Sequence, residues 1–315
     1  MRVSDLFRYA FWGCLATAVL AGCGGSQPAG RAAPGVKSTG TWGTNTSSDD
    51  LIYVAGQASS YVLSYTTGKL VGSIDSGGQA ACSDKNGNVF LTGGDEVLEY
   101  SHGGTTPVAT LELPGESPES VGCASDPISG NLAVTFGTTD DDQNVAIFPD
   151  GQGTPTVYQS GINSQFSGYD DEGNLFVDGF NQRSVGLAEL PNGSGSFNVI
   201  TIDQSIGGDP WSIQWDGQYI TIEGITQKTF QLSRLQISGS TATIVGTTKS
   251  SRALSKARGS WIFGKKVLVP FGKHGEIGFW DYPHGGKAER LLSKKNFGQG
   301  VGFFYGLTVS VGPTR

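Results

Sequence analysis

Charged residues and histidines are scarce in this sequence. Asp, Glu, Lys and Arg make up 16% of the 315 residues and there are 3 histidines, whereas an average globular domain has roughly 25% charged residues. The chain has no Gly-rich phosphate-binding loop, no Gly-x-Ser-x-Gly motif and no His-Glu-x-x-His motif. Nucleotide-binding, serine-hydrolase and zinc-protease functions therefore receive no support from motifs.

Basic residues are outnumbered by acidic ones, with 21 Lys and Arg against 28 Asp and Glu and a net charge of −7. This balance disfavours nucleic acid as a partner, because the phosphate backbone attracts cations. It also disfavours electrostatic docking to anionic lipid, so we expect membrane association only through a covalent anchor. No cofactor is expected, and no spaced set of side chains demands a metal.

The apolar run near the N-terminus is too short to span a bilayer. It covers residues 9–20 and follows Arg2 and Arg8, a pattern typical of a signal peptide. The run ends in Leu20-Ala21-Gly22-Cys23, which resembles the bacterial lipobox. The resemblance implies removal of residues 1–22 and attachment of lipid to the Cys23 thiol; an ordinary signal peptide with an unrelated cysteine is the alternative.

Residues 23–49 contain little that could build a core. They are rich in Gly, Ser, Thr, Ala and Pro, with Trp42 as the exception, and we interpret them as a flexible tether after the lipidated cysteine. Gly24 stands where an aspartate would signal retention in the inner membrane of some Gram-negative bacteria. We therefore expect an exported, lipid-anchored envelope protein, at the outer membrane if the source is Gram-negative, with its folded domain at residues 50–315.

A repeated pattern fills that domain. The 49 glycines of the whole chain are largely interspersed with short Val, Ile and aromatic runs, as expected for short strands and tight turns. A strand–turn–strand pattern returns about every 44 residues, a period in the range of propeller blades. In the clearest copies, at 82–91, 125–134 and 169–177, an Asp and a Gly-Asn pair separate two apolar runs. A second hairpin follows each copy, which predicts four antiparallel strands per repeat.

The two ends of the domain complete one another. Weaker copies at 215–221 and 263–269 bring the internal repeats to five. Residues 51–74 supply the second, third and fourth strands of a repeat that lacks its first strand, and residues 305–311 supply a first strand with nothing after it. We therefore predict an all-β, six-bladed β-propeller closed by a mixed N- and C-terminal blade. The recurring Asp-x-x-Gly-Asn-apolar phrase resembles NHL-repeat and gluconolactonase-like propellers over nearly all of residues 51–315.

A few polar residues fall on the face where such propellers carry ligands. Glu119, Asn163 and Asp209 stand at the starts of first strands and suggest a weak oxygen-ligand site, with solvated polar loops as the alternative. His274, next to Glu276, is the one histidine on that face and the catalytic candidate for lactonase-like or lyase-like chemistry. A lone histidine without a second partner is a poor acid–base catalyst.

Aromatic residues give a stronger indication of binding. Those at or near first strands and the loops that feed them are Trp211, Trp215, Trp261, Phe303, Phe304 and Tyr305. Flat rings around a channel could stack on sugars or clamp a peptide, and they could equally pack between blades. We predict Trp211, Phe303 and Phe304 as ligand contacts, together with Asp209 and Glu119.

Cys82 and Cys123 remain after Cys14 leaves with the signal peptide and Cys23 is acylated. An exported protein can oxidise such a pair. Cys82 stands two residues before its Asp and Cys123 three before its own, an offset that would place them on different faces of their strands. Disulfide formation therefore stays open.

Three functions fit these observations. The leading hypothesis is a monomeric, non-enzymatic envelope scaffold that binds a protein, peptide or glycan on one propeller face. The alternative is a propeller hydrolase or lyase with a channel-face site around His274, Glu276, Asp209 and Glu119. A mainly structural cell-surface protein is the third. An enzyme requires converging polar groups and a perturbed titrating residue, whereas a scaffold requires an exposed aromatic or apolar patch.

Overall fold

The computed structural model describes residues 49–225, 229–251, 253–254, 256–272, 275–298 and 301–313. Within these ranges the chain is all-β, apart from the one-turn helix α1 (Lys294–Phe297) and the 3-10 turn η1 (Pro149–Gly151). The predicted signal peptide, Cys23, nearly all of the predicted tether and His274 lie outside them. No helix in these ranges is long and apolar enough to cross a membrane.

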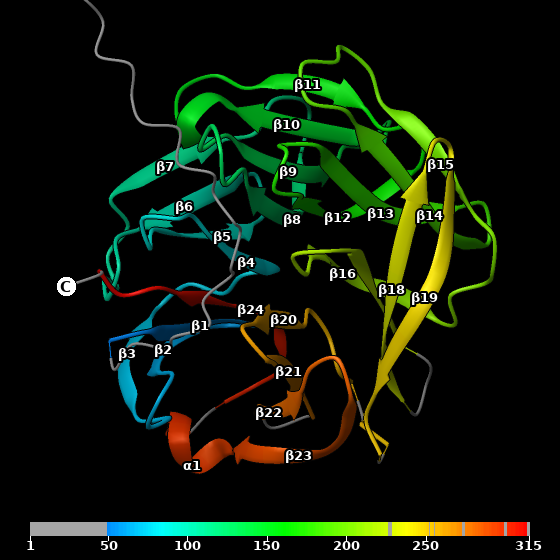
Figure 1. Cartoon of the computed structure of the whole chain (residues 1–315). Coiled ribbons are helices and arrows are strands. Elements are labelled where there is room, and N and C mark those ends of the chain that lie inside the picture. Colours follow the sequence, from blue (N-terminus) through cyan, green and yellow to red (C-terminus); the bar gives the residue numbers. More distant parts are fainter. Residues whose placement is uncertain are drawn as a thin grey trace, which may run out of the picture. The chain divides into compact units, whose positions relative to one another are not determined.

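Four-stranded antiparallel sheets, with strands paired in chain order, are the repeating unit (Figure 1). Three of them are complete within one stretch of chain: β4 (Ala80–Ser83), β5 (Val89–Gly93), β6 (Glu96–Tyr100) and β7 (Ala109–Glu112); β8 (Glu119–Ser125), β9 (Leu132–Gly137), β10 (Asn144–Phe148) and β11 (Thr156–Gln159); and β20 (Trp261–Phe263), β21 (Lys266–Phe271), β22 (Glu276–Asp281) and β23 (Gly285–Leu292).

A further sheet is built from both ends of the domain. It has the order β24 (Phe304–Ser310), β1 (Leu51–Gly56), β2 (Ser60–Ser64) and β3 (Leu70–Ile74). The last strand pairs antiparallel with the first, with Leu51 opposite Ser310 and Val54 opposite Leu307. The predicted mixed sheet is therefore present.

One sheet is larger than predicted and contains eight strands. Two four-stranded antiparallel runs compose it: β12 (Asn163–Tyr169), β13 (Leu175–Asn181), β14 (Ser184–Leu190) and β15 (Asn198–Ile202); and β16 (Asp209–Trp215), β17 (Ile220–Ile225), β18 (Phe230–Ser238) and β19 (Thr241–Lys249). The outer strands β15 and β19 pair in parallel through Thr201 with Thr241 and Ile202 with Ala242. At nine residues, β19 is long enough to reach the edge of β15 and to satisfy backbone groups that an edge strand leaves free.

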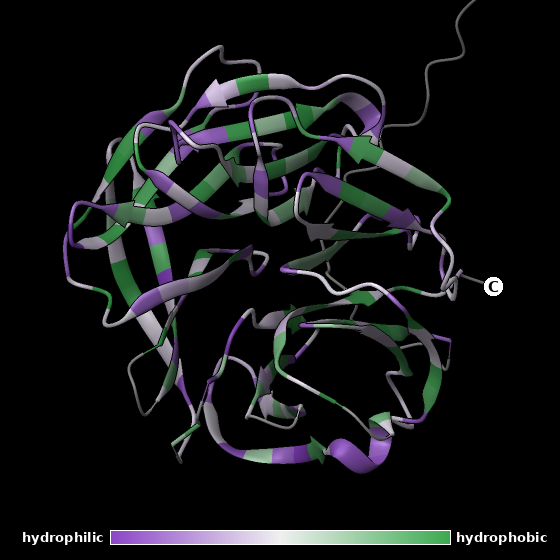
Figure 2. Cartoon of the chain, turned by 180° about the vertical axis from the view of Figure 1, so that it is seen from behind, coloured by the Kyte–Doolittle hydropathy of each residue, from purple (hydrophilic) through white to green (hydrophobic). Residues whose placement is uncertain are grey.

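The first strand of every four-stranded run lies innermost. β4, β8, β12, β16, β20 and β24 contact one another in a closed cycle, each touching the next and β24 touching β4 (Figure 1). Between neighbouring sheets, buried apolar side chains form six clusters in the described residues, and alternate residues of one strand enter different clusters. Ile52 and Val54 pack toward β21 and β22, for example, whereas Tyr53 packs toward β5. Figure 2 shows the resulting mixture of hydrophobic and hydrophilic residues along the strands.

The Asp-x-x-Gly-Asn phrase closes the turn between first and second strands. In the third copy, Asp170 Oδ1 accepts from the backbone N–H groups of Glu172 and Asn174, both at 2.9 Å. The Asn174 amide donates to Asp170 Oδ2 at 2.8 Å, and its oxygen accepts from Asn192 N in the turn between third and fourth strands. Gly173 has a φ of 81°, which a glycine adopts without steric cost. The repeat motif thus stabilises the turn between first and second strands and joins it to the turn between third and fourth strands.

Cys82 and Cys123 form a disulfide between the inner strands β4 and β8, with Cα atoms 5.8 Å apart. The two cysteines do alternate onto opposite faces of their strands: Cys82 pairs with Phe90, and Cys123 with Val134. Neighbouring sheets meet through opposite faces, and both cysteines enter the same cluster. The offset in the sequence therefore brings the two thiols together, and the disulfide that the sequence left open is present.

Removing this disulfide should destabilise the domain. Because it closes a loop with a sequence separation of 41, the Cys82→Ala/Cys123→Ala variant should lose about 4 kcal/mol of unfolding free energy through the added entropy of the unfolded chain. Denaturant unfolding with and without reductant measures this. Reductant should lower the wild-type midpoint to that of the variant and leave the variant unchanged; equal midpoints without reductant would contradict the prediction.

Candidate functional site

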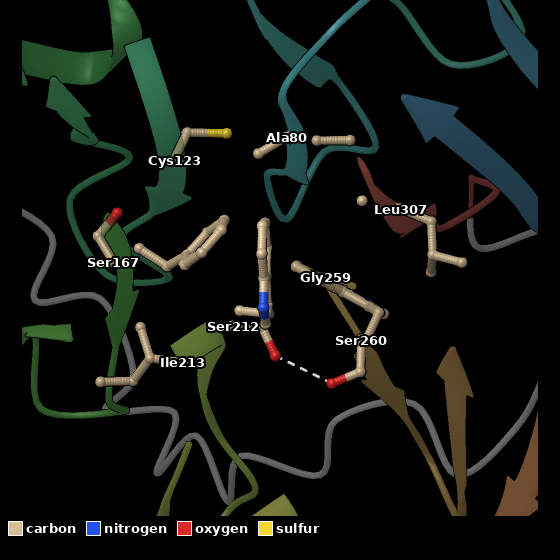
Figure 3. A pocket seen from close by; sticks show the side chains of 13 residues that line it. Ala80, Cys123, Ser167, Ser212, Ile213, Gly259, Ser260 and Leu307 are labelled. Carbon is tan, nitrogen blue, oxygen red and sulfur yellow. Dashed lines mark hydrogen bonds between the residues drawn. The ribbon is translucent and has the colours of Figure 1, made fainter. Parts of the chain in front are cut away.

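A small cavity lies at the centre of the six inner strands (Figure 3). Each strand or the residue directly before it contributes a lining residue: Ala80, Cys123, Ser167, Ser212, Ser260 and Leu307. Its volume of about 30 Å³ holds on the order of two water molecules. A ligand larger than about two water molecules cannot enter this cavity and must contact the residues around its entrance.

The entrance carries aromatic rings and cations. Trp211, at the start of β16, also lines the cavity, and the Arg258 guanidinium lies 4.2 Å from its ring centroid. The same guanidinium lies 5.4 Å from the ring of Tyr305. Lys256 Nζ lies 4.2 Å from the ring of Phe303. We call these five residues the channel mouth, because Lys256 and Phe303 stand two residues along the chain from Arg258 and Tyr305. All three rings are partly exposed and Lys256 is exposed.

A glycine brings the two halves of the channel mouth together. Gly259 has a φ of 58°, and a Cβ atom there would stand 2.6 Å from Tyr305 O and from Gly306 Cα. Only a residue without a side chain allows the segment before β20 to lie this close to β24. That approach positions Arg258 next to Tyr305.

A buried acid stands behind the cavity wall. Glu223 on β17 is fully buried, and its Oε2 accepts from Ser260 N at 2.7 Å and from Ser212 Oγ at 3.1 Å. The Ser212 and Ser260 hydroxyls lie 2.9 Å apart (Figure 3). Burial raises the pKa of Glu223 to about 7, against the opposing effect of these hydrogen bonds. A titrating group is thus connected to the cavity through two hydroxyls.

Glu223 belongs to a series of polar side chains at the fourth position of second strands. Thr92 Oγ1 accepts a hydrogen bond from Ala80 N. The same hydroxyl donates a long one, 3.5 Å, to the carbonyl oxygen of Val121. Thr135 Oγ1 likewise accepts from Gly122 N and donates to Gln165 O at 2.6 Å. These threonines therefore connect the inner strand of their own sheet to that of the next.

Asp178 occupies the corresponding position on β13. Its Oδ1 accepts from Phe166 N at 3.0 Å, while Oδ2 has no hydrogen-bond partner within the described part of the chain. Burial raises the pKa of Asp178 well above its ordinary value, and the Glu223 charge raises it further. A protonated Asp178 has an O–H to donate, as a threonine does. Val121 in β8 and Gln165 in β12 are the bulged residues of their strands, and their carbonyls face the two threonines. Trp211 is the bulged residue of β16, so it occupies the corresponding position relative to Asp178.

The predicted ligand-binding residues divide between surface and core. Trp211 and Phe303 lie in the channel mouth. Phe304 is 3% exposed and packs edge-on against Tyr61 and Phe297, a placement that favours interblade packing rather than ligand contact. The described chain therefore offers two of the three predicted rings to a ligand.

The polar candidates do not converge. Glu119 and Asp209 are exposed first residues of β8 and β16, and Glu276 is the half-buried first residue of β22. His274 lies outside the described residues. Asn163 donates to Asp142 Oδ2 and accepts from Gln165 Nε2. In the ranges that the structure describes, no group of three or more His, Cys, Asp or Glu side chains could hold a metal ion.

Sequence reasoning did not identify Arg258, Lys256, Glu223, Ser212 and Ser260 as site residues. A signal for Glu223 exists, because it interrupts the apolar pattern of β17 at the position where earlier repeats have Thr92, Thr135 and Asp178. Arg258 has no such signal. It stands in a connecting segment, and its aromatic partners are about 47 residues away on either side.

Comparison with known proteins supports the fold. The sequence matches no protein-family profile and no curated protein. Similar solved structures include the nidogen/laminin complex (14% identity, TM-score 0.63, covering 83% of this chain and 98% of that one) and a protein of unknown function from Bacteroides caccae (14%, 0.60, 84% and 99%). The β-propeller domain of Cps50 (Swd1) from Myceliophteria thermophila is also similar (10%, 0.51, 76% and 83%). At these identities the likeness shows a β-propeller fold and nothing of its chemistry.

Glu223 should make stability depend on pH. Its folded-state pKa of about 7 lies above the ordinary value of 4.5, so its contribution is fully present below about pH 4.5 and is lost as the pH rises through 7. Between pH 5 and pH 8 the loss should be roughly 2–3 kcal/mol. Glu223→Gln should flatten this part of the pH profile of thermal unfolding, whereas the exposed control Glu119→Gln should keep the wild-type slope. An unchanged slope in Glu223→Gln would contradict the assignment.

Proposed function

We propose that this chain is a non-enzymatic binding scaffold of the cell envelope, a six-bladed propeller that presents its channel mouth to a protein, peptide or glycan. The channel mouth carries this proposal. The Arg258 guanidinium lies over the partly exposed rings of Trp211 and Tyr305, and Lys256 lies over the partly exposed ring of Phe303. Aromatic and Arg side chains are enriched in the residues that dominate binding energies.

The six-bladed interpretation has two supports. Six inner strands contact one another in a cycle, and six clusters of buried apolar residues fill the spaces between successive sheets. The eight-stranded sheet then counts as two blades whose outer strands β15 and β19 touch at their edges. NHL-like or gluconolactonase-like ancestry remains part of the proposal.

A hydrolase or lyase is the second candidate, and one observation favours it. Ser212 Oγ donates to a carboxylate whose pKa is raised to about 7, at the wall of a cavity. Such a pair resembles a nucleophile with its general base. The scaffold is preferred because Glu223 is fully buried, the cavity holds only about two waters and both hydroxyls already bond within the wall.

Binding at the channel mouth can be tested with glycan and peptide arrays. Phe303→Ala should lose the signals of the wild-type ligands at least tenfold, because it removes a partly exposed ring and leaves the core intact. Phe197→Ala, which removes a partly exposed ring between β14 and β15, is the matched control and should bind like wild type. Equal binding by Phe303→Ala would overturn the proposal, and so would release of products from a bound ligand. Thermal unfolding of each variant checks that the fold persists.

We propose Cys23 as the lipid anchor and residues 24–49 as the tether to the propeller. Labelling cells with a fatty-acid analogue should mark the wild-type protein and the Cys14→Ala control. Cys23→Ala should remain unlabelled and leave the membrane fraction, because it lacks the thiol that accepts the lipid. Labelling of Cys23→Ala at the wild-type level would show that the anchor is wrong.

A further inference from the structure

Arg258 is held in an unusual environment. Its guanidinium lies 4.2 Å from the Trp211 centroid and 5.4 Å from the Tyr305 centroid, so two rings restrict its motion. In the described ranges no carboxylate bonds to it, and its backbone N–H alone forms a hydrogen bond, to Pro270 O. A guanidinium has five N–H donors in a planar fork. Those of Arg258 are left for solvent or a ligand.

Two other described arginines show the usual alternative. Arg234 also lies over aromatic rings, but its Nε donates to Asp216 Oδ2 at 2.7 Å. Arg290 lies over Phe279 and donates to the Tyr65 carbonyl at 2.6 Å. In both cases the ring contact accompanies a hydrogen bond that connects parts of the fold. Arg258 has the ring contacts without a side-chain hydrogen bond to any described residue, an arrangement suited to binding a ligand rather than to connecting parts of the fold.

Lys256, two residues before Arg258 in the chain, supplies a second cation. Its Nζ lies over the Phe303 ring and has no ion-pair partner among the residues described. The whole chain has a net charge of −7, so these two cations are a local exception to an acidic protein. Two cations without ion-pair partners in the described part of the chain favour a ligand with negative charge.

We propose that the channel mouth binds the carboxylate of an acidic sugar, with Arg258 forming a bidentate pair and Lys256 strengthening the attraction. This inference rests on the proposed binding function and names the class of ligand. The planar fork of Arg258 matches the two oxygens of one carboxylate. The partly exposed rings of Trp211, Phe303 and Tyr305 suit the apolar face of a sugar ring. The backbone N–H of exposed Gln57 donates to Phe303 O, and its side-chain amide is offered to a sugar hydroxyl.

The cavity beneath the mouth agrees with a sugar held at the entrance. It holds about two waters, so the body of the ligand stays among the rings. An acidic peptide would also need main-chain hydrogen bonds, usually supplied by a free strand edge. The mouth presents side-chain rings and cations, and we therefore favour the glycan.

The inference is tested by calorimetric titration with two acidic oligosaccharides, from alginate and from hyaluronan, and with their carboxyl-reduced neutral forms. Wild type should bind at least one acidic form, at least tenfold more tightly than its neutral form, and more weakly as salt increases. Arg258→Gln should weaken that binding at least tenfold, and Lys256→Gln by about threefold. Arg258→Lys should fall between wild type and Arg258→Gln, because it keeps the charge and loses the fork.

Arg183→Gln is the matched control. Arg183 is exposed between β13 and β14, so the substitution removes the same charge without touching the mouth, and binding should remain at the wild-type level. Lys256→Gln keeps the test informative if Arg258→Gln unfolds, because Lys256 is exposed.

Three outcomes would overturn the inference. The first is binding of neither acidic oligosaccharide. The second is equal affinity for acidic and neutral forms, or binding that is insensitive to both Arg258→Gln and Lys256→Gln. The third is Arg258-dependent binding of poly-glutamate in preference to the sugars, which would assign the mouth to an acidic peptide. Neutral ligands that are lost in Phe303→Ala and kept in Arg258→Gln would leave the proposed function standing and reject only the carboxylate.

Discussion

Burial of two apolar faces per sheet is the constraint on which this structure depends. Successive residues of a strand point to opposite faces, and in β1 both sets are apolar: Ile52 and Val54 enter one cluster, Tyr53 and Ala55 another. Such a sheet needs a neighbour on each side, and its neighbours need the same. The cycle of contacts from β4 round to β24 meets that requirement, because every sheet in it has a neighbour on each side. The mixed sheet is the place where the chain closes this cycle.

Close packing at the centre leaves backbone groups of the bulged inner strands in need of partners. Thr92 and Thr135 supply them with one hydroxyl each, which accepts from one strand and can donate to the next. Asp178 and Glu223 stand at the same positions with carboxyl groups, which are more costly to bury when charged. Their raised pKa values follow from this position. The same geometry therefore supports the ring and places a titrating group behind the cavity.

The channel mouth depends on that closure as well. Trp211 comes from β16, Arg258 from the segment before β20 and Tyr305 from β24, so three consecutive inner strands supply one cluster. Gly259 allows the segments to approach, because any side chain there would collide with the backbone of β24. The faces of Trp211 and Tyr305 then hold the guanidinium, and its N–H donors have no hydrogen-bond partner among the described residues. A surface of this kind is suited to recognising charge and shape together.

Local patterns were sufficient to predict much of the propeller. The Asp-x-x-Gly-Asn turns could be predicted because Asp170 and Asn174 form their hydrogen bonds within one hairpin, and the orphan strands at the two ends required each other. Trp211 and Phe303 were predicted at the binding face from their place next to first strands. The pairing of β15 with β19, the burial of Phe304, the Cys82–Cys123 disulfide and the mouth around Arg258 were decided by tertiary structure. Each of these four features depends on which faces of separate sheets meet. The spacing of residues along one strand does not determine which strand of a neighbouring sheet will pack against it.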